Sequence, residues 1–177
     1  LERVGKRAAF VATGQTGIAI AGLGIAVDAV VADFIAGAAE RMVCDAAESA
    51  DWIVVEGQGA LTHPGFSGVT LGLLHGSAPD LLLLCHDAGR TEVKGFPGLP
   101  IRPLRELVEL YEAAATWSRR AGARVPVAGL ALNTSALDSE AATRAIQRAA
   151  AETGLPAADP VREGDAGADR LAAALLR

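Results

Sequence analysis

The chain has 177 residues and 51% of them are hydrophobic, so we expect a single domain over residues 1–177 with a core of its own. The formal net charge is −5 and no basic block occurs, which argues against nucleic acid as a partner. The longest strongly apolar stretch, residues 18–27, is too short to span a bilayer, so no membrane partner is expected. The two cysteines show no metal-binding spacing, and free thiols favour a cytoplasmic protein.

Short apolar segments alternate with segments of helical periodicity along the whole chain. The predicted strands cover residues 8–13, 52–55, 80–85, 127–132 and 155–159. The predicted helices cover residues 28–50, 69–75, 103–121, 139–153 and 166 onward, and residues 18–25 are expected to form a loop or a short helical turn. This order predicts an α/β fold of three layers, in which helices cover both faces of a mostly parallel sheet.

The strand predicted at residues 52–55 ends on a carboxylate, Glu56, followed by Gly57-Gln58-Gly59. In an open α/β sheet, ligands bind outside the carboxyl ends of the strands. The two glycines allow the backbone to turn sharply and to lie close to a ligand. Glu56 is therefore a candidate for holding a metal or a substrate amine. The alternative is that Glu56 caps the N–H groups of its own loop.

Polar segments follow three further predicted strands. They are Thr13-Gly14-Gln15-Thr16-Gly17, His86-Asp87-Ala88-Gly89-Arg90 and Asn133-Thr134-Ser135. Right-handed crossovers would place the ends of these strands on one edge of the sheet. Turn chemistry needs Gly and Asp but not Gln, Glu, His and Arg together, so four such segments predict a ligand crevice.

Several residues of these segments have both a functional and a structural interpretation. His63 and His86 are candidates for acid–base work, although a single histidine more often satisfies the backbone. Arg90 would clamp a carboxylate or phosphate, or form a surface salt bridge. Asp28 would help to hold a metal, or interact favourably with a helix dipole. Gly5-Lys6-Arg7 is not a phosphate-binding loop, because Arg7 replaces the required Ser or Thr.

Longer strings of the sequence carry a family resemblance. They include residues 10–18 (FVATGQTGI), 33–40 (DFIAGAAE), 54–59 (VVEGQG), 67–77 (SGVTLGLLHGS) and 153–156 (TGLP). On these strings the chain resembles the C-terminal, P-loop-NTPase-like domain of the family that contains D-glutamate N-acetyltransferase. It is similar, more distantly, to dethiobiotin synthetase. Within the first family, a strand and a glycine loop with a lysine precede the matching segment, so we expect a fragment that lacks the first strand and the phosphate loop.

The resemblance implies an enzyme that transfers an acetyl group from acetyl-CoA to the amine of a D-glutamate-like amino acid, in amino-acid catabolism. For such an enzyme, the candidate catalytic residues are Glu56, His63 and His86. The candidate substrate-binding residues are Gln15, Thr16, Gln58, Arg90 and Arg162. The candidate cofactor-binding residues are Gly14, Gly17, Gly57, Gly59, Asn133 and Thr134. By similarity to dethiobiotin synthetase, Glu56 would bind a metal or the substrate amine, with Asp28 or, alternatively, Asp33 as its partner.

Two alternatives to acetyl transfer remain open. The likeness to dethiobiotin synthetase favours a ligase-type enzyme that uses ATP and Mg. A chain without its phosphate loop favours an inactive, nucleotide-binding module. A missing strand would also leave a gap or an exposed apolar edge in the sheet, which predicts a homo-oligomer.

Overall fold

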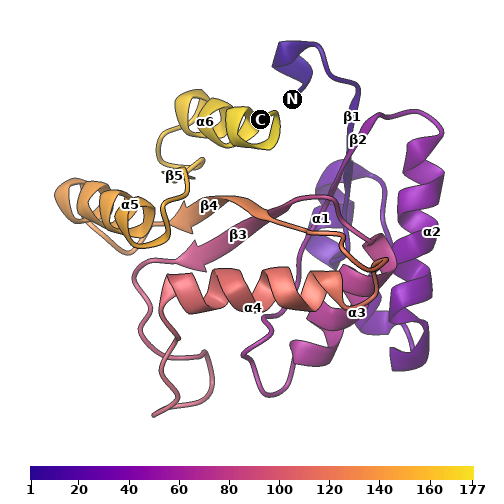
Figure 1. Cartoon of the computed structure of the whole chain (residues 1–177), viewed down its shortest axis with the longest axis horizontal. Coiled ribbons are helices and arrows are strands. Elements are labelled where there is room, and N and C mark those ends of the chain that lie inside the picture. The colour runs from indigo at the N-terminus through magenta and orange to yellow at the C-terminus, as the bar shows by residue number, and fades with distance from the viewer. The chain divides into compact units, whose positions relative to one another are not determined.

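A computed structural model describes all residues, 1–177. The chain divides into two compact units, and each is described here by itself (Figure 1). Unit 1 comprises Leu1–Pro79 and Ala114–Ala121, and unit 2 comprises Asp80–Ala113 and Gly122–Arg177.

Every strand pair of the protein is parallel. In unit 1, β1 (Ala8–Val11) pairs with β2 (Trp52–Val55). In unit 2, β3 (Leu82–Asp87) pairs with β4 (Val127–Asn133), which pairs with β5 (Ala157–Ala158). The α/β class with parallel strands and flanking helices is thus confirmed, but the strands form a two-stranded and a three-stranded sheet instead of one.

Six α-helices connect and flank the strands. They are α1 (Gln15–Ala21), α2 (Ile35–Ala47), α3 (Ser67–Ser77), α4 (Leu104–Thr116), α5 (Ser139–Thr153) and α6 (Asp165–Leu175). Short 3₁₀-helices cover Glu2–Val4 (η1), Val27–Ala29 (η2) and Ala32–Phe34 (η3). None of the helices combines the length and the apolar character that crossing a membrane requires.

Two predicted helix boundaries are wrong. The helix expected from residue 28 begins only at Ile35, because Val30 has an extended backbone and separates η2 from η3. Branching at Cβ disfavours a helical backbone at this position. The segment expected as a loop or a short turn forms the regular helix α1, which begins already at Gln15.

The end of β3 also differs from the prediction. Strand pairing continues through His86 and Asp87, which lie opposite Leu132 and Asn133 of β4. Both residues therefore belong to the strand and not to the loop after it. The backbone hydrogen bonds to β4 hold His86 at a fixed position, which matters for the pocket described below.

The core of unit 1 lies between its strands and helices α2 and α3. Its buried members are Val11, Val27, Ala39, Met42 and Leu73. Helices α2 and α3 approach closely at Gly76, which has no side chain. A Cβ atom added there would lie 2.0 Å from the carbonyl oxygen of Ala36. On the strands, the register partners Phe10 and Val54 are 45% and 39% exposed.

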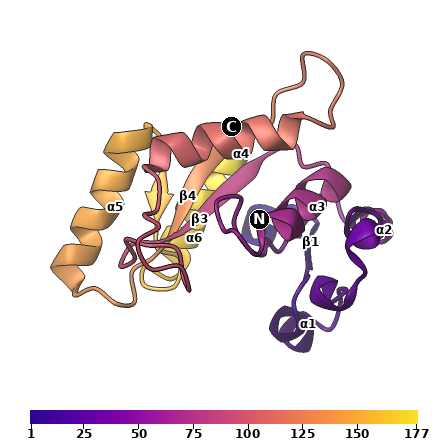
Figure 2. The ribbon, with the colours of Figure 1, turned by 90° about the horizontal axis from the view of Figure 1, so that it is seen from below.

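The core of unit 2 is formed by both faces of its sheet. Leu84, Leu130 and Leu132 pack with Leu104 and Leu107 of α4 and with Ala149 of α5. Gly129 faces Leu171 of α6, so helices cover both faces of β4. Figure 2 shows α4 and α5 near the strands of this unit. Asp138 caps α5 by accepting a hydrogen bond from the Ala141 N–H, and Gly154 ends the helix with φ of 74°.

Candidate functional site

The Glu56 carboxylate binds the backbone of the loop after β1. Its Oε2 atom accepts hydrogen bonds from the N–H groups of Thr13, at 2.8 Å, and Gly14, at 3.0 Å. The N–H groups of the loop at Thr13 and Gly14 thus bind an anion that the chain itself supplies. Glu56 therefore caps backbone N–H groups, as the structural alternative proposed. These groups belong to the neighbouring loop after β1 and not to the loop of Glu56 itself.

Gln58 and Thr70 hold the same two loops together. The Gln58 amide donates to the Thr13 carbonyl oxygen at 2.5 Å and to the Thr13 hydroxyl at 3.0 Å. The Thr13 hydroxyl donates to the Glu56 carbonyl oxygen at 3.0 Å. The Thr70 hydroxyl donates to the Gln58 carbonyl oxygen at 2.8 Å. Thr13 is fully buried. Glu56 and Gln58 thus join β1, β2 and α3 through side-chain contacts to the backbone.

Three of the four predicted cofactor glycines in unit 1 serve this internal packing. A Cβ atom at Gly17 would lie 2.6 Å from Glu56 Oε2, and one at Gly14 would lie 3.4 Å from the Gln58 amide nitrogen. At Gly59, φ is +69° and a Cβ would lie 2.8 Å from the Phe66 carbonyl oxygen. Gly57, in contrast, has open space around it.

The residues predicted to bind a metal do not form a complete ligand set. No group of three or more His, Cys, Asp or Glu side chains comes together in the structure. One oxygen of Glu56 is already bound to two N–H groups, and Asp28 lies 3.4 Å from the amide nitrogen of Gln15. Gln15 and Thr16 are exposed at the start of α1. These residues do not form a complete protein cage for a cation, and metal binding by Asp28 and Glu56 stays a prediction.

His63 lies in the loop before α3. Its Nδ1 accepts a hydrogen bond from the Gly65 N–H at 3.1 Å, and its ring packs against Phe66 with a centroid distance of 4.5 Å. These contacts orient the imidazole within its own loop. The catalytic role of His63 stays a prediction.

Thr134 and Arg162 contact the buried carboxylate of Asp159 in unit 2. The Asp159 carboxylate accepts from the N–H and hydroxyl groups of Thr134 at 2.9 and 2.5 Å, and from the N–H groups of Val161 and Arg162. Burial raises the pKa of Asp159, but the hydrogen bonds, led by that of the Thr134 hydroxyl, outweigh burial and lower it below the ordinary value.

The Arg162 guanidinium completes this network. It donates to the hydroxyl and carbonyl oxygens of Thr134, both at 2.8 Å, and to the Leu137 carbonyl oxygen at 2.7 Å. The Asn133 side chain accepts from the Ser135 N–H at 3.0 Å. In this arrangement Thr134 and Arg162 join the loops after β4 and β5, and their binding roles stay a prediction.

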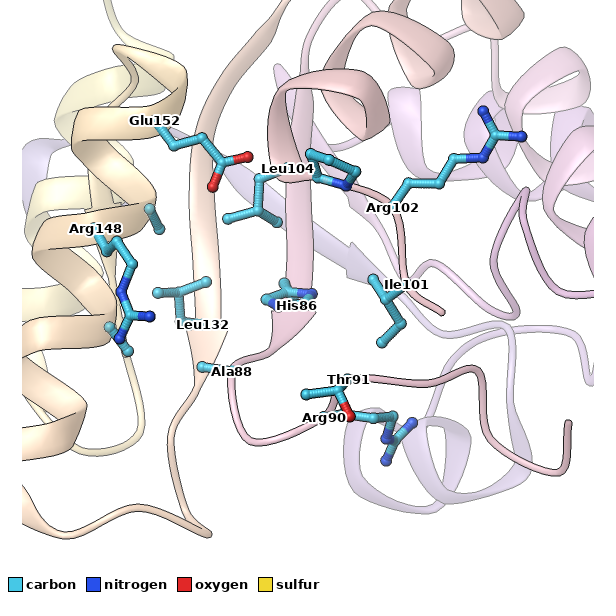
Figure 3. A pocket seen from close by; sticks show the side chains of 13 residues that line it. His86, Ala88, Arg90, Thr91, Ile101, Arg102, Leu104, Leu132, Arg148 and Glu152 are labelled. Carbon is cyan, nitrogen blue, oxygen red and sulfur yellow. The ribbon is translucent and has the colours of Figure 1, made fainter. Parts of the chain in front are cut away.

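Unit 2 also contains an open pocket with a volume of about 420 Å³ (Figure 3). It is bounded by the end of β3, the segment before α4, and one side of α5. Leu132, Ile101 and Leu104 contribute apolar surface. The charged side chains that line it are three arginines and one glutamate, namely Arg90, Arg102, Arg148 and Glu152. An apolar pocket with a few polar groups is typical of small-molecule sites.

His86 lies at the centre of this pocket (Figure 3). It is partly buried, and its ring makes no hydrogen bond with the protein. Burial lowers the pKa of His86 below the ordinary value, the carboxylates of Asp87 and Glu152 oppose this shift, and Arg90 adds to it. The imidazole is therefore mainly neutral at pH 7, as a general base must be.

Of the predicted substrate-binding residues, Arg90 is the one that lines this pocket with His86. Its guanidinium forms an ion pair with Asp87 at 2.9 Å. A salt bridge was the structural alternative predicted for Arg90. Arg148 and Glu152 were not predicted, because on the sequence they belong to an ordinary polar helix. Arg148 and Glu152 are four residues apart, which places them on the same side of α5. This spacing is the only feature of the sequence that could have indicated that they act together.

Parallel strands with flanking helices, and polar loops at the strand ends, define an open α/β protein. The chain belongs to the DUF1611 family: residues 1–172 match its domain described as "Domain of unknown function (DUF1611_C) P-loop domain". A crystal structure of a DUF1611 family protein from Anabaena variabilis is similar, with a TM-score of 0.90 and 47% identity, over 99% of this chain and 50% of that one.

Two relatives are named D-glutamate N-acetyltransferase. The protein from a Pseudoalteromonas species is 44% identical over 155 residues, which are 88% of this chain and 46% of the relative. The protein from Tritonibacter scottomollicae is 42% identical over 171 residues, which are 97% of this chain and 49% of the relative. The chain thus spans about half the length of the relatives that it matches.

Proposed function

We propose that this chain forms part of an N-acetyltransferase that moves an acetyl group from acetyl-CoA to the amine of D-glutamate or a similar amino acid. The observation that carries this proposal is His86, whose ring lacks protein partners in a pocket with three arginines and one glutamate. The names of the relatives support the reaction and the amino acid. We place the reaction in amino-acid catabolism as part of the same proposal.

The proposed chemistry requires a free amine, because an ammonium ion has no lone pair to attack a carbonyl carbon. His86 would take one proton from the ammonium group of the amino acid. The amine nitrogen would then form a bond to the carbonyl carbon of the acyl thioester, and the C–S bond would break. The attacking nitrogen loses a second proton to solvent, and the imidazolium returns its proton to the leaving thiolate, so that His86 ends neutral.

Glu56 has a different role in this proposal from the one predicted. Its Oε2 atom is bound to the N–H groups of Thr13 and Gly14, so we assign it to holding the loop after β1. The same N–H groups are no longer free to bind a phosphate of acetyl-CoA or ATP. The absence of a metal ligand set in these residues gives no support for the ligase-type alternative with Mg.

The test uses the purified protein with acetyl-CoA and D-glutamate. Mass spectrometry should detect N-acetyl-D-glutamate, in an amount equal to the coenzyme A released. A parallel reaction with ATP and Mg²⁺ should release no phosphate that depends on the amino acid. Phosphate release without acetylated product would contradict the proposal and favour the ligase-type alternative.

Two further features of the protein are part of the proposal. Cys44 and Cys85 are both free thiols, which supports a reducing compartment such as the cytoplasm. The exposed pair of Phe10 and Val54 supports self-association into a homo-oligomer. Light scattering should then give a mass above 18.0 kDa that is a multiple of the chain mass.

A further inference from the structure

Two charged residues of α5, Arg148 and Glu152, line the pocket around His86. They are four residues apart and lie on the same side of the helix. In Figure 3 the carboxylate of Glu152 extends from α5 toward Leu104, and the guanidinium of Arg148 lies beside Leu132. The pocket therefore presents a cation, an anion and an imidazole over an apolar floor.

Arg148 makes no hydrogen bond or ion pair with the protein, including with Glu152. One turn earlier on the same helix, Arg144 and Glu140 do form an ion pair. The order of the charges contributes to this contrast, since Glu before Arg is the favourable order and Arg148 precedes Glu152. As a result, α5 carries one closed ion pair outside the pocket and one open pair of opposite charges within it.

Glu152 is held in place on one side only. Its Oε1 atom accepts a hydrogen bond from the Arg105 N–H at 3.2 Å, at the start of α4. Its second carboxylate oxygen has no partner in the protein. Glu152 thus has a structural contact that orients it and a free oxygen that can accept a hydrogen bond from a ligand.

We propose that this pocket binds a zwitterionic amino acid, with its carboxylate on Arg148, its ammonium group on Glu152, and its amine nitrogen beside His86. A guanidinium binds a carboxylate through two parallel hydrogen bonds, which fixes the orientation of the ligand. This inference rests on the proposed function, and it identifies the acceptor site for the acetyl group.

The proton transfer that follows involves only groups within the pocket. One ammonium proton passes to a ring nitrogen of His86, which leaves a neutral amine and an imidazolium. The charged groups that face or neighbour His86 are Asp87, Arg90, Glu152 and Arg148. The depressed pKa of His86 keeps the ring neutral before the ligand binds.

The other two arginines of the lining are already paired with carboxylates. Arg90 and Arg102 belong to its lining, and their guanidinium groups point away from His86 in Figure 3. Arg102 lies 3.7 Å from Glu106, a loose ion pair at an exposed position. Arg90 likewise forms an ion pair with Asp87 at 2.9 Å. Arg148 is therefore the one arginine of the lining whose guanidinium is left for the α-carboxylate of the ligand.

The experiment measures ligand binding by calorimetry with two probes, D-glutamate and glutarate, which has two carboxylates but no ammonium group. Arg148→Gln should raise the Kd of both probes by about tenfold or more, because a charge-assisted hydrogen bond is lost. Glu152→Gln should raise the Kd of D-glutamate but not that of glutarate. The glutamine keeps an oxygen for the Arg105 N–H and removes only the charge.

Arg144→Gln is the matched control, since it removes the same charge from the same helix outside the pocket. It should leave both Kd values within about twofold of the unmodified protein, the scale of a surface charge. His86→Gln should change the Kd for D-glutamate by less than about threefold, but it should lower turnover by about a hundredfold, the usual contribution of a general base.

The outcomes separate this inference from the proposed function. If D-glutamate binds with the expected pattern and no acetylated product forms, the binding site stands and the transferase proposal fails. If product forms but Arg148→Gln and Glu152→Gln behave like Arg144→Gln, the transferase proposal stands and this site is overturned. The proposed site would also be overturned if D-glutamate did not bind at millimolar concentration. The same holds if Glu152→Gln weakened the binding of glutarate as much as that of D-glutamate.

Discussion

The side chain of Glu56 accepts a hydrogen bond from the backbone N–H of Thr13 at 2.8 Å, and so joins the ends of β1 and β2. Glu56→Ala should lower the free energy of unfolding by about 1–3 kcal/mol, because the Thr13 and Gly14 N–H groups lose their acceptor. Glu56→Gln keeps one oxygen acceptor and should cost less. Urea denaturation measures both effects. An unchanged stability of Glu56→Ala together with lost activity would instead indicate direct participation in the chemistry.

Helices α2 and α3 should not tolerate a methyl group at Gly76. The added Cβ would lie 2.0 Å from the Ala36 carbonyl oxygen, so the two helices would have to separate. We expect Gly76→Ala to destabilise the protein by about 1–3 kcal/mol, as overpacking usually does. Gly68→Ala is the control in the same helix, since nothing lies near its Cβ position. That variant should be neutral or more stable by up to about 1 kcal/mol. Thermal unfolding measures the stability of both variants. Equal losses of stability in Gly76→Ala and Gly68→Ala would contradict the close approach of the two helices.

The Asp159 network predicts a dependence of stability on acid pH. The pKa of Asp159 is lowered in the folded protein, so its contribution is fully present above the unfolded value of about 3.9 and is lost as pH falls through the folded value. Asp159→Asn should remove this dependence and should cost about 2–3 kcal/mol at pH 7, because hydrogen bonds to a charged acceptor are lost.

Asp138→Asn is the control for this change. Asparagine is as good a helix N-cap as aspartate, so this variant should retain its stability within about 0.5 kcal/mol. Denaturant unfolding between pH 3 and 7 compares the variants. A parallel loss of stability in Asp159→Asn and the unmodified protein below pH 4 would place the acid sensitivity elsewhere.

His86 predicts the acid limb of the proposed reaction. The neutral imidazole is the active base, and protonation inactivates it as pH falls. Because burial lowers the pKa of His86, kcat/KM should begin to fall only below the ordinary histidine value of about 6.5. His86→Gln should retain low activity without this limb. A pH profile of the purified protein with D-glutamate tests the expectation, and an identical acid limb in the variant would assign the titration to another group.

Much of the architecture follows from local patterns in the sequence. The apolar strands and their parallel arrangement were predictable from the alternation of strand and helix, and the ends of α5 from Asp138 and Gly154. The start of α2 was not, because the apolar periodicity of residues 28–34 resembles a helix although Val30 is extended. Periodicity records which side chains are apolar, and it does not record the backbone angles that pack them.

The sequence by itself determined that Glu56, Gln58, His86 and Arg90 follow or end strands, since strand ends can be read from composition. Only the tertiary structure decided what each of them contacts. It turned Glu56 toward the Thr13 loop and brought Arg148 and Glu152 to the pocket of His86. The physical reason is that a hydrogen bond or a pocket depends on atoms from segments 40 or more residues apart, whose distances are set by packing of the core and not by any local pattern.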